Sequence, residues 1–400
     1  MNSQRCLYIT PQFPLSPDSA GGAGAIFYEQ LVTLAALGQE IDLWHISLPA
    51  HQSALQPFFE PDSNHWQIIQ SLCRSVTLSV APAQPTVGLR LKNKLAAYGK
   101  GEWVSWPYLT SFFEPLLKAK IAKLQPNYIW AQHFWAAQLA SWQRVVPVIY
   151  SHHDWLFRVK ALRTSRPENP TVRQTEEKVA RRVAAVVSGS AVECAELRQL
   201  GCRQVHYLPI AYEPVSLELA IVPNDPRLVH LGGFATTANQ MGLARFAAVV
   251  WPGLQLPAGQ IHLVGDMSFA PAGLTPFLNQ VVVHGFVPEL KQVLRPYDLH
   301  IIAYEHPTGQ RTRLPVAFNF AQVVVAVRAG IAGYPEAQDG VNCRLVNRIE
   351  EMAGVIQELM ADPDQRLRLG RAARETFEKS FTRPGLLPRY QQLLKTINPI

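Results

Sequence analysis

The sequence contains no uninterrupted apolar run of the roughly 18 residues that a transmembrane helix requires. Residues 1–14 lead into a short apolar segment and then prolines, without the apolar stretch and small-residue cleavage site of a secretory signal. The five cysteines show neither the paired spacing of a metal site nor the density of a disulfide scaffold. We therefore expect a cytoplasmic protein with reduced thiols.

Several catalytic motifs are also missing. The chain has no G-x-x-x-x-G-K-[ST] phosphate loop, no G-x-S-x-G turn, and no G-x-G-x-x-G after the first apolar segment. ATPase, serine hydrolase and NAD-dependent dehydrogenase activities are therefore disfavoured. The histidine spacing offers too few ligands for zinc, and we expect neither a metal nor a cofactor.

Charged residues are scarce, at 17%, whereas apolar residues make up 48%, which is typical of a packed globular protein. The 37 Lys and Arg exceed the 30 Asp and Glu, and the resulting net charge of +7 favours an anionic ligand such as a phosphate. The basic residues form no coherent stripe, so we expect no nucleic-acid partner.

Short β-branched, apolar segments alternate with amphipathic helical stretches, which is the order of parallel βαβ units. The predicted strands of the first half are 6–10, 41–47, 128–131, 146–151, 184–188 and 205–208. Those of the second half are 228–232, 261–265, 281–284, 299–303, 323–327 and 343–346.

The proline-containing segment 209–226 separates the two halves, because its four prolines disfavour a helix or a central strand. The sequence thus predicts an α/β protein with Rossmann-like, doubly wound domains at 1–208 and 227–380, facing each other across a cleft. A helical tail, 381–400, is expected to pack back on one of them. In such sheets ligands bind beyond the carboxyl ends of the strands.

A glycine-rich turn containing Gly21 and Gly22 follows the first predicted strand and precedes a helix predicted over 25–37. Backbone N–H groups at such a turn, together with the helix dipole, favour a phosphate. Tight packing of the turn is an equally good explanation.

Arg311 and Arg313 follow Gly309 just after the predicted strand 299–303. Two guanidinium groups can pair with the oxygens of a diphosphate, which suits a pyrophosphate-containing leaving group. A solvated basic loop or a surface ion pair is the alternative.

His133 and His153 each follow a predicted strand, where a histidine can hydrogen-bond a sugar hydroxyl or a phosphate. A structural role is the alternative for each. The segment 86–124 interleaves basic and aromatic residues, which fits either contact with an anionic membrane surface or an inserted helical subdomain.

Taken in order, these segments resemble the family 4 retaining glycosyltransferases of the GT-B fold, over nearly the whole chain. The resemblance is strongest in 229–239, 261–265, 283–287, 297–299 and 330–342, and 11–22 is similar to the family's first loop. It implies metal-independent transfer of a hexose from a nucleotide-diphosphate sugar to a sugar, glycolipid or polysaccharide acceptor, with peripheral contact at the inner membrane face as one option.

The resemblance also implies roles for individual residues. Arg311 and Arg313 would hold the diphosphate, and His133 and His153 would lie near the reacting centre. The remaining donor-binding residues would be Gly21, Gly22, Gly233, Phe286, Val287, Gly309 and Glu336.

One departure concerns the donor ribose. The family usually has glutamates where this chain has Val316 and Thr308, and a valine cannot accept hydrogen bonds from ribose hydroxyls. A non-catalytic protein of the same fold, which binds a partner or ligand without transferring sugar, is therefore the alternative function.

Overall fold

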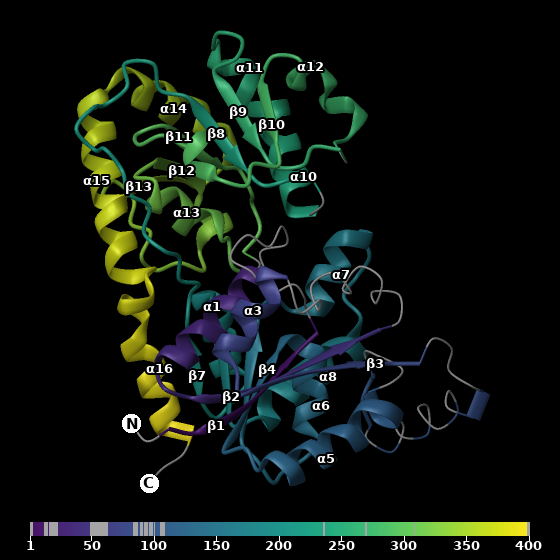
Figure 1. Ribbon diagram of the computed structural model, residues 1–400. Helices are drawn as coiled ribbons and strands as arrows, with labels where there is room; N and C mark the ends of the chain where they lie inside the picture. Colours follow the sequence, from purple (N-terminus) through teal and green to yellow (C-terminus); the bar gives the residue numbers. More distant parts are fainter. Residues whose placement is uncertain are drawn as a thin grey trace. The chain divides into compact units, whose positions relative to one another are not determined.

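The computed structural model describes residues 3–11, 15, 23–48, 63–82, 87–88, 91, 95, 99, 101–104, 109–234, 237–268, 270–307 and 309–397. The chain divides into two compact units (Figure 1). Unit 1 consists of Met1–Gly189, Glu193–Ile210 and Leu387–Ile400, and unit 2 of Ser190–Val192 and Ala211–Leu386.

Unit 1 is built on a seven-stranded parallel sheet with the order β3-β2-β1-β4-β5-β6-β7. Its strands are β1 Arg5–Thr10, β2 Glu40–Ser47, β3 Ser75–Val80, β4 Tyr128–Gln132, β5 Val148–His152, β6 Ala185–Ser188 and β7 Val205–Tyr207. Six of them match predicted strands. The prediction missed β3, because this edge strand is only half-buried and its alternating polar residues give a weak apolar signal.

The helices of unit 1 cover a core formed by the apolar faces of this sheet. They are α1 Ala23–Ala36, α3 Asn64–Leu72, α5 Glu114–Leu124, α6 His133–Ser141, α7 Leu156–Thr164, α8 Pro170–Arg182 and α9 Ala191–Gln199, with a π-helical turn at Leu109–Phe113. In α1, the predicted helical face of Phe27, Leu31 and Leu34 is fully buried.

The aromatic residues of segment 86–124 that the structure describes pack into unit 1. Phe113 is buried in the core, and Trp103 and Phe112 pack against it. These three side chains therefore have the core role that the subdomain interpretation predicts. The basic residues Arg90, Lys92, Lys94 and Lys100 lie outside the described residues.

Unit 2 contains a six-stranded parallel sheet with the order β10-β9-β8-β11-β12-β13. Its strands are β8 Leu228–Leu231, β9 Ile261–Val264, β10 Val282–Gly285, β11 Leu299–Ile302, β12 Val323–Val327 and β13 Cys343–Val346. All six were predicted, with ends that agree to within a residue. Both sheets have the 3-2-1-4-5-6 strand order of a doubly wound Rossmann fold, which confirms the predicted fold class.

The longer helices of unit 2 are α10 Thr237–Arg245, α13 Arg313–Asn319, α14 Met352–Ala361 and α15 Pro363–Ser380. Shorter helical segments are a π-turn at Phe246–Val250, α11 Trp251–Leu254, α12 Thr275–Leu278, and 3-10 turns at Ala272–Leu274, Leu290–Gln292, Arg328–Ile331 and Ile349–Glu351. The last helix, α16 Arg383–Ile397, begins in unit 2, and its residues from Leu387 onward belong to unit 1. There Tyr390 stacks on Trp130 with 6.0 Å between ring centroids.

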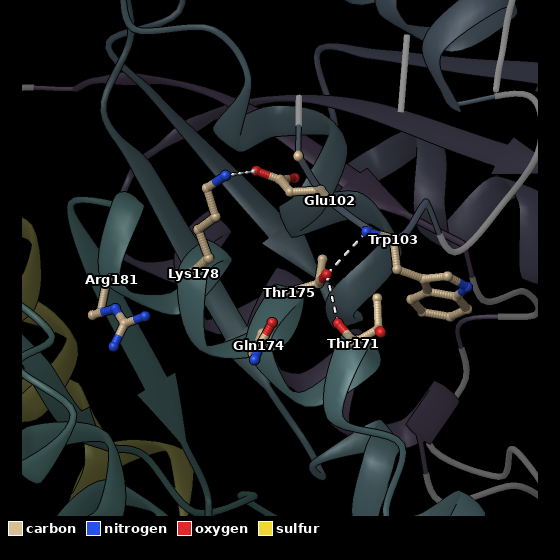
Figure 2. Close-up of a pocket in the computed structure, with 8 residues that line it drawn as sticks. Glu102, Trp103, Thr171, Gln174, Thr175, Lys178 and Arg181 are labelled. Atoms are coloured by element: carbon tan, nitrogen blue, oxygen red, sulfur yellow. Dashed lines mark hydrogen bonds and ion pairs between the residues drawn. The ribbon is translucent and has the colours of Figure 1, made fainter. Parts of the chain in front are cut away.

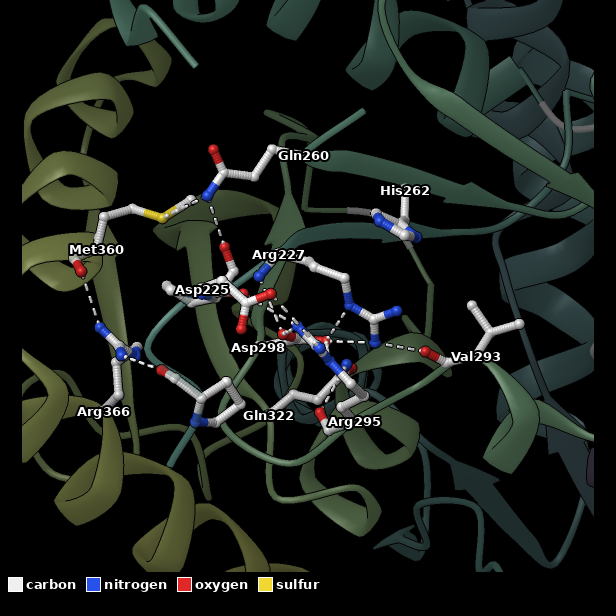
Figure 3. Close-up of polar contacts among 12 residues, drawn as sticks. Asp225, Arg227, Gln260, His262, Val293, Arg295, Asp298, Gln322, Met360 and Arg366 are labelled. Carbon is white, nitrogen blue, oxygen red and sulfur yellow. Dashed lines mark hydrogen bonds and ion pairs between the residues drawn. The ribbon is translucent and has the colours of Figure 1, made fainter. Parts of the chain in front are cut away.

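A buried carboxylate organises the amino edge of the unit 2 sheet (Figure 3). Asp298, which precedes β11 and is fully buried, accepts hydrogen bonds from Arg227, which precedes β8, and from Arg295. Arg227 also donates to the carbonyl of Val293. This network fixes the start of the two central strands, whose opposite ends are described below.

Segment 209–226 forms no helix or strand. It is tied to unit 2 by hydrogen bonds from Tyr297 Oη to the carbonyl of Leu219 and from the Tyr212 amide to the carbonyl of Phe381. All five cysteines are free. Among the described residues, no helix is both long and apolar enough to cross a membrane.

Candidate functional site

The central strands of unit 2, β8 and β11, lie side by side, and their following segments turn away in opposite directions across the sheet. Doubly wound folds bind ligands at this point. Gly232 and Gly233 follow β8, and the segment with Gly309, Arg311 and Arg313 follows β11. The topology therefore brings two of the predicted donor-binding segments to one edge.

The turn after β8 requires glycine. Gly232 has φ +127°, and a Cβ there would lie 2.6 Å from Nδ2 of Asn239 and 3.2 Å from Nη2 of Arg313. A Cβ on Gly233 would lie 2.7 Å from the carbonyl oxygen of Asp266. The distances of 2.6 Å and 2.7 Å are shorter than a Cβ tolerates, and 3.2 Å is tight. The absence of side chains at these two glycines therefore allows Asn239 and Arg313 to approach the backbone.

Asn239, in α10, connects the two sides of this edge. Its Oδ1 accepts a hydrogen bond from Nη2 of Arg313, and its Nδ2 donates to the carbonyl of Gly233 over 2.7 Å. Arg313 is the first residue of α13. The asparagine thus fixes the guanidinium beside the glycine turn.

Arg313 carries a positive charge that no carboxylate offsets, since no Asp or Glu among the described residues lies within ion-pair distance of it. Burial, and then the neighbouring charge of Arg311, lower its pKa to about 9. The buried His230 and His300 lie close enough to feel the same charge. Burial is the largest cause that lowers both pKa values, and the charge of Arg313 lowers them further. The pKa of His300 falls to about 4, although its hydrogen bond with Gln322 acts in the opposite direction. The imidazoles are therefore neutral at pH 7, and the local field favours an anion.

Arg311 lies over the face of Tyr304, with its guanidinium carbon 4.2 Å from the ring centroid. Tyr304 follows β11, and its carbonyl lies against Gly330, where a Cβ would clash. This cation–π contact restricts the long side chain to the carboxyl edge of β11. Sequence reasoning did not identify Tyr304, because an aromatic residue after a buried strand usually indicates only core packing.

The other predicted donor-binding residues of unit 2 also lie at the carboxyl ends of strands. Gly309, with φ +60°, lies between β11 and α13. Glu336 lies between β12 and β13, and its carbonyl accepts a hydrogen bond from Asn342. Phe286 and Val287 follow the edge strand β10, and Phe286 is 60% exposed.

The two positions that depart from the family pattern differ in how far they are described. Val316, in α13, packs against an apolar cluster that includes Val229 and Phe320. It thus contributes an apolar contact where the resemblance places a ribose-binding carboxylate. Thr308 lies outside the described residues, as do Gly21 and Gly22.

In unit 1 the corresponding central strands are β1 and β4, and His133 follows β4 directly as the first residue of α6. Its φ is +67°, a conformation that L-residues with a Cβ adopt rarely and that is concentrated at functional sites. The ring stacks on Trp135 at 4.3 Å, and burial, then the charge of His152, lower its pKa to about 4. His133 is therefore neutral near pH 7.

His153 lies beside His133, with 6.0 Å between ring centroids, so the structure brings the two predicted histidines together. Nε2 of His153 lies 3.3 Å from both Ser151 Oγ and Gln132 Oε1. Gln132 and Ser151 are in turn hydrogen-bonded to Gln30 of α1. This polar network is buried, and burial lowers the pKa of His153 well below its usual value.

His152, the residue before His153, belongs to a second buried cluster of titratable groups, together with Glu193 and Glu176. The sequence analysis did not predict this cluster. Nδ1 of His152 is 3.3 Å from Oε2 of Glu193, and both side chains are inaccessible. Burial opposes the charged imidazole, but Glu193 outweighs it and raises the pKa of His152. Glu176 in α8 accepts hydrogen bonds from the first two amides of α7, those of Leu156 and Phe157. The adjacent histidines His152 and His153 were the only feature of the sequence that pointed to this cluster.

No three His, Cys, Asp or Glu side chains within the described residues are close enough together to hold a metal ion. The groups that the two carboxyl edges offer to a ligand are the cationic, amide and neutral imidazole groups described above. They suit binding of a phosphate-bearing, hydroxyl-rich molecule.

Comparisons with known proteins agree with this geometry. A model described as "Glycosyl transferase 4-like domain" matches residues 21–213, and one described as "Glycosyl transferases group 1" matches residues 225–362. The search of curated protein sequences finds no match.

Solved structures similar to this chain share its whole length at low identity. A sucrose-phosphate synthase from Thermosynechococcus elongatus has a TM-score of 0.68 and 18% identity, over 98% of this chain and 99% of that one. HepE of Anabaena, in complex with UDP, gives 0.60 and 17%, over 98% and 100%. A variant of S. aureus TarM, in complex with Fondaparinux, alpha-GlcNAc-glycerol and UDP, gives 0.65 and 9%, over 99% and 100%.

At these identities the structural similarity establishes the fold, and the two domain models between them account for most of the sequence. Each unit carries the strand order and the carboxyl-edge groups described above. The chain belongs to the glycosyltransferases of the GT-B fold.

Proposed function

We propose that the protein is a family 4 type, retaining hexosyltransferase that moves a sugar from a nucleotide-diphosphate donor to a hydroxyl acceptor without a metal ion. The observation that carries this proposal is the charge of Arg313, which Asn239 holds against the Gly232–Gly233 turn and which no carboxylate in the described part of the chain offsets. A diphosphate is the anion that suits two adjacent guanidinium groups.

The chemistry assigned to unit 2 is electrostatic. When the bond between sugar and diphosphate breaks, negative charge develops on the oxygens of the departing phosphate. Arg311 and Arg313, already held in place by Tyr304 and Asn239, stabilise this charge with little rearrangement during the reaction. Fixed cations can thus do what a divalent metal does in other transferases.

In unit 1 we assign neutral His133 and His153 to the acceptor and the transferred sugar. Both imidazoles are neutral near pH 7, so each can donate one hydrogen bond and accept another. That combination suits hydroxyl groups. Retention of configuration is proposed to follow front-face substitution, in which the donor phosphate itself takes up the acceptor proton, so no protein nucleophile is assigned.

We propose UDP-sugars as the first donor class to test, because HepE and the TarM variant have been solved with UDP. The acceptor is proposed to be a sugar, glycolipid or polysaccharide. For a glycolipid, the basic residues of segment 86–124 would allow peripheral contact with the inner membrane face.

A thermal-shift screen tests the donor assignment. UDP, GDP and ADP, and their common sugar conjugates, are added without divalent metal to the wild type and to Arg311→Ala. At a ligand concentration of about 100 times Kd the fold should gain roughly 2.7 kcal/mol. A shift for one nucleotide that the variant loses supports the proposal.

Val316 favours a second candidate, a non-catalytic protein of the same fold. Because Val316 packs in an apolar cluster, it offers no hydrogen bond to a ribose. The absence of a thermal shift with every nucleotide would favour this candidate. So would nucleotide binding without release of UDP from a UDP-sugar, when oligosaccharide acceptors are supplied.

A further inference from the structure

Unit 1 contains a recess that the proposed transfer reaction does not use (Figure 2). It has a volume of about 610 Å³ and lies between α8 and residues 101–103. Thr171, Gln174, Lys178 and Arg181 line it from α8, at spacings that place them on one face of the helix. A smaller recess of about 190 Å³ adjoins it and is lined by Arg144 and Arg182.

Both recesses share Glu102, whose carboxylate is buried with 1% of its side chain exposed. Its oxygens accept hydrogen bonds from Arg182 and from Nε1 of Trp142, the latter over 3.0 Å, and lie 3.5 Å from Nζ of Lys178. Burial opposes ionisation, but these partners outweigh it and lower the pKa of Glu102. The carboxylate of Glu102, at the floor shared by the two recesses, is therefore fixed in position, and Arg182 and Lys178 already offset its negative charge.

The rim carries positive charge beyond what Glu102 offsets. Arg144 and Arg181 are exposed, and neither forms a hydrogen bond or ion pair with any residue that the structure describes. The amide of the exposed Gln174 has no described partner either. The two adjoining recesses together thus present the guanidinium groups of Arg181 and Arg144, the amide of Gln174 and the hydroxyl of Thr171. This combination matches a ligand with both carboxylates and hydroxyls.

The direction of the recess relates it to the transfer site. α6 begins at His133, at the carboxyl edge of the sheet, and Trp142 follows its last residue, so Trp142 lies about 13 Å further along the helix. α8 ends three residues before β6, so Arg181 lies toward the amino edge. Trp103 stacks with Phe134, next to His133, at 6.4 Å between centroids. Because Thr171 lies ten residues before Arg181 on the same helix, the lining extends along α8 from the side of the carboxyl edge to the amino edge of the sheet.

We propose that these two adjoining recesses form one binding site for an acidic carbohydrate chain, with Arg144 and Arg181 pairing with carboxylates and Gln174 and Thr171 hydrogen-bonding hydroxyls. The proposal deepens the proposed function, because it rests on a carbohydrate acceptor whose reacting end is at His133. It adds that the acceptor is a chain bearing negative charge several sugars away from that end. A flat membrane surface fits less well, because Arg144 and Arg181 line two adjoining recesses that share the polar floor of Glu102.

The test measures binding of tetragalacturonic acid and of the neutral maltotetraose by isothermal titration calorimetry, at low and moderate salt. We expect the wild type to bind the acidic tetrasaccharide, more weakly as salt rises, and to bind the neutral one at least roughly tenfold less well. The double variant Arg144→Glu/Arg181→Glu should lose at least about tenfold in affinity for the acidic ligand. Arg203→Glu, an exposed arginine of unit 1 outside the recess, makes half the charge change, and its effect should stay below about twofold.

Three outcomes would overturn the site: no binding of the acidic ligand to the wild type, equal binding of the neutral one, or equal losses in the double variant and in Arg203→Glu. Binding to anionic vesicles, without binding of the soluble acidic ligand, would also overturn it in favour of a membrane. The UDP thermal shift is recorded for every variant. It should not change, and its absence in the wild type would contradict the proposed function while leaving the oligosaccharide result to stand by itself.

Discussion

Arg313 donates a hydrogen bond to Oδ1 of Asn239, while Nδ2 of the same Asn239 donates to the carbonyl of Gly233. One amide therefore joins the segment after β8 to the start of α13. The consequence is a guanidinium fixed at the point where a doubly wound sheet binds its ligand.

Replacing Asn239 by alanine should release Arg313 and weaken nucleotide binding. A hydrogen bond to a charged group contributes about 1.5–3 kcal/mol, so the Kd for the bound nucleotide should rise by roughly tenfold or more. Calorimetric titration with UDP measures this. Arg313→Lys, which keeps the charge but not the planar guanidinium, should also weaken binding, though less than Arg313→Ala. Equal affinity of the wild type and Asn239→Ala for UDP would show that Arg313 is not part of the donor site.

His133 should be replaceable by asparagine without loss of the fold, but with loss of transfer. Asparagine tolerates the φ of +67° better than alanine does, so His133→Ala should be less stable than His133→Asn by up to about 1 kcal/mol. Thermal unfolding of the two variants gives this difference. Release of UDP in the presence of an acceptor should fall by at least about a hundredfold in both, because the positioned hydrogen bonds of the imidazole are lost. An active His133→Asn variant would show that this residue has only a structural role.

The substitution Asp298→Ala, which removes the carboxylate, should strongly destabilise unit 2. Arg227 and Arg295 would lose their common buried partner, and breaking such a pair costs about 3–5 kcal/mol. Asp225→Ala is the matched control, because Asp225 is 84% exposed, lies 4.0 Å from Arg295, and should change stability by less than about 0.5 kcal/mol. Urea unfolding followed by fluorescence compares the two. Similar losses in both variants would contradict the role given to Asp298.

Glu176 should make unit 1 more stable in mildly acidic than in alkaline solution. Burial raises its pKa from 4.5 to about 7, so between these values the folded state binds more protons than the unfolded one. The stabilisation is fully present below pH 4.5, decreases as pH rises through about 7, and amounts to about 3 kcal/mol at most. His152, whose pKa is also raised, acts in the same direction.

The measurement is the unfolding free energy of the wild type and Glu176→Gln at several pH values between 5 and 8. The glutamine cannot ionise, so its stability should fall less with pH than that of the wild type. Since His152 is present in both proteins, the difference isolates the carboxyl group. Parallel pH profiles would show that Glu176 remains ionised throughout.

Local pattern in the sequence was enough to predict the α/β class and most strands. Twelve of the thirteen strands were predicted because buried parallel strands are continuous apolar runs, a signal that needs no partner to be recognised. The exception, β3, is half-buried at a sheet edge, and its pattern depends on what it packs against. The same local logic placed Arg313 and His133 after strands, where a parallel sheet collects its functional groups.

The sequence by itself therefore determined which segments form strands, which residues follow them, and the excess of positive charge. Tertiary structure alone decided the partners: Asn239 with Arg313 across 74 residues, His152 with Glu193, and Glu102 with Arg182. These pairs join segments far apart in the chain, so no local pattern encodes them. Their chemistry arises from burial, because only the folded chain removes the water that would otherwise screen their charges and set their pKa values.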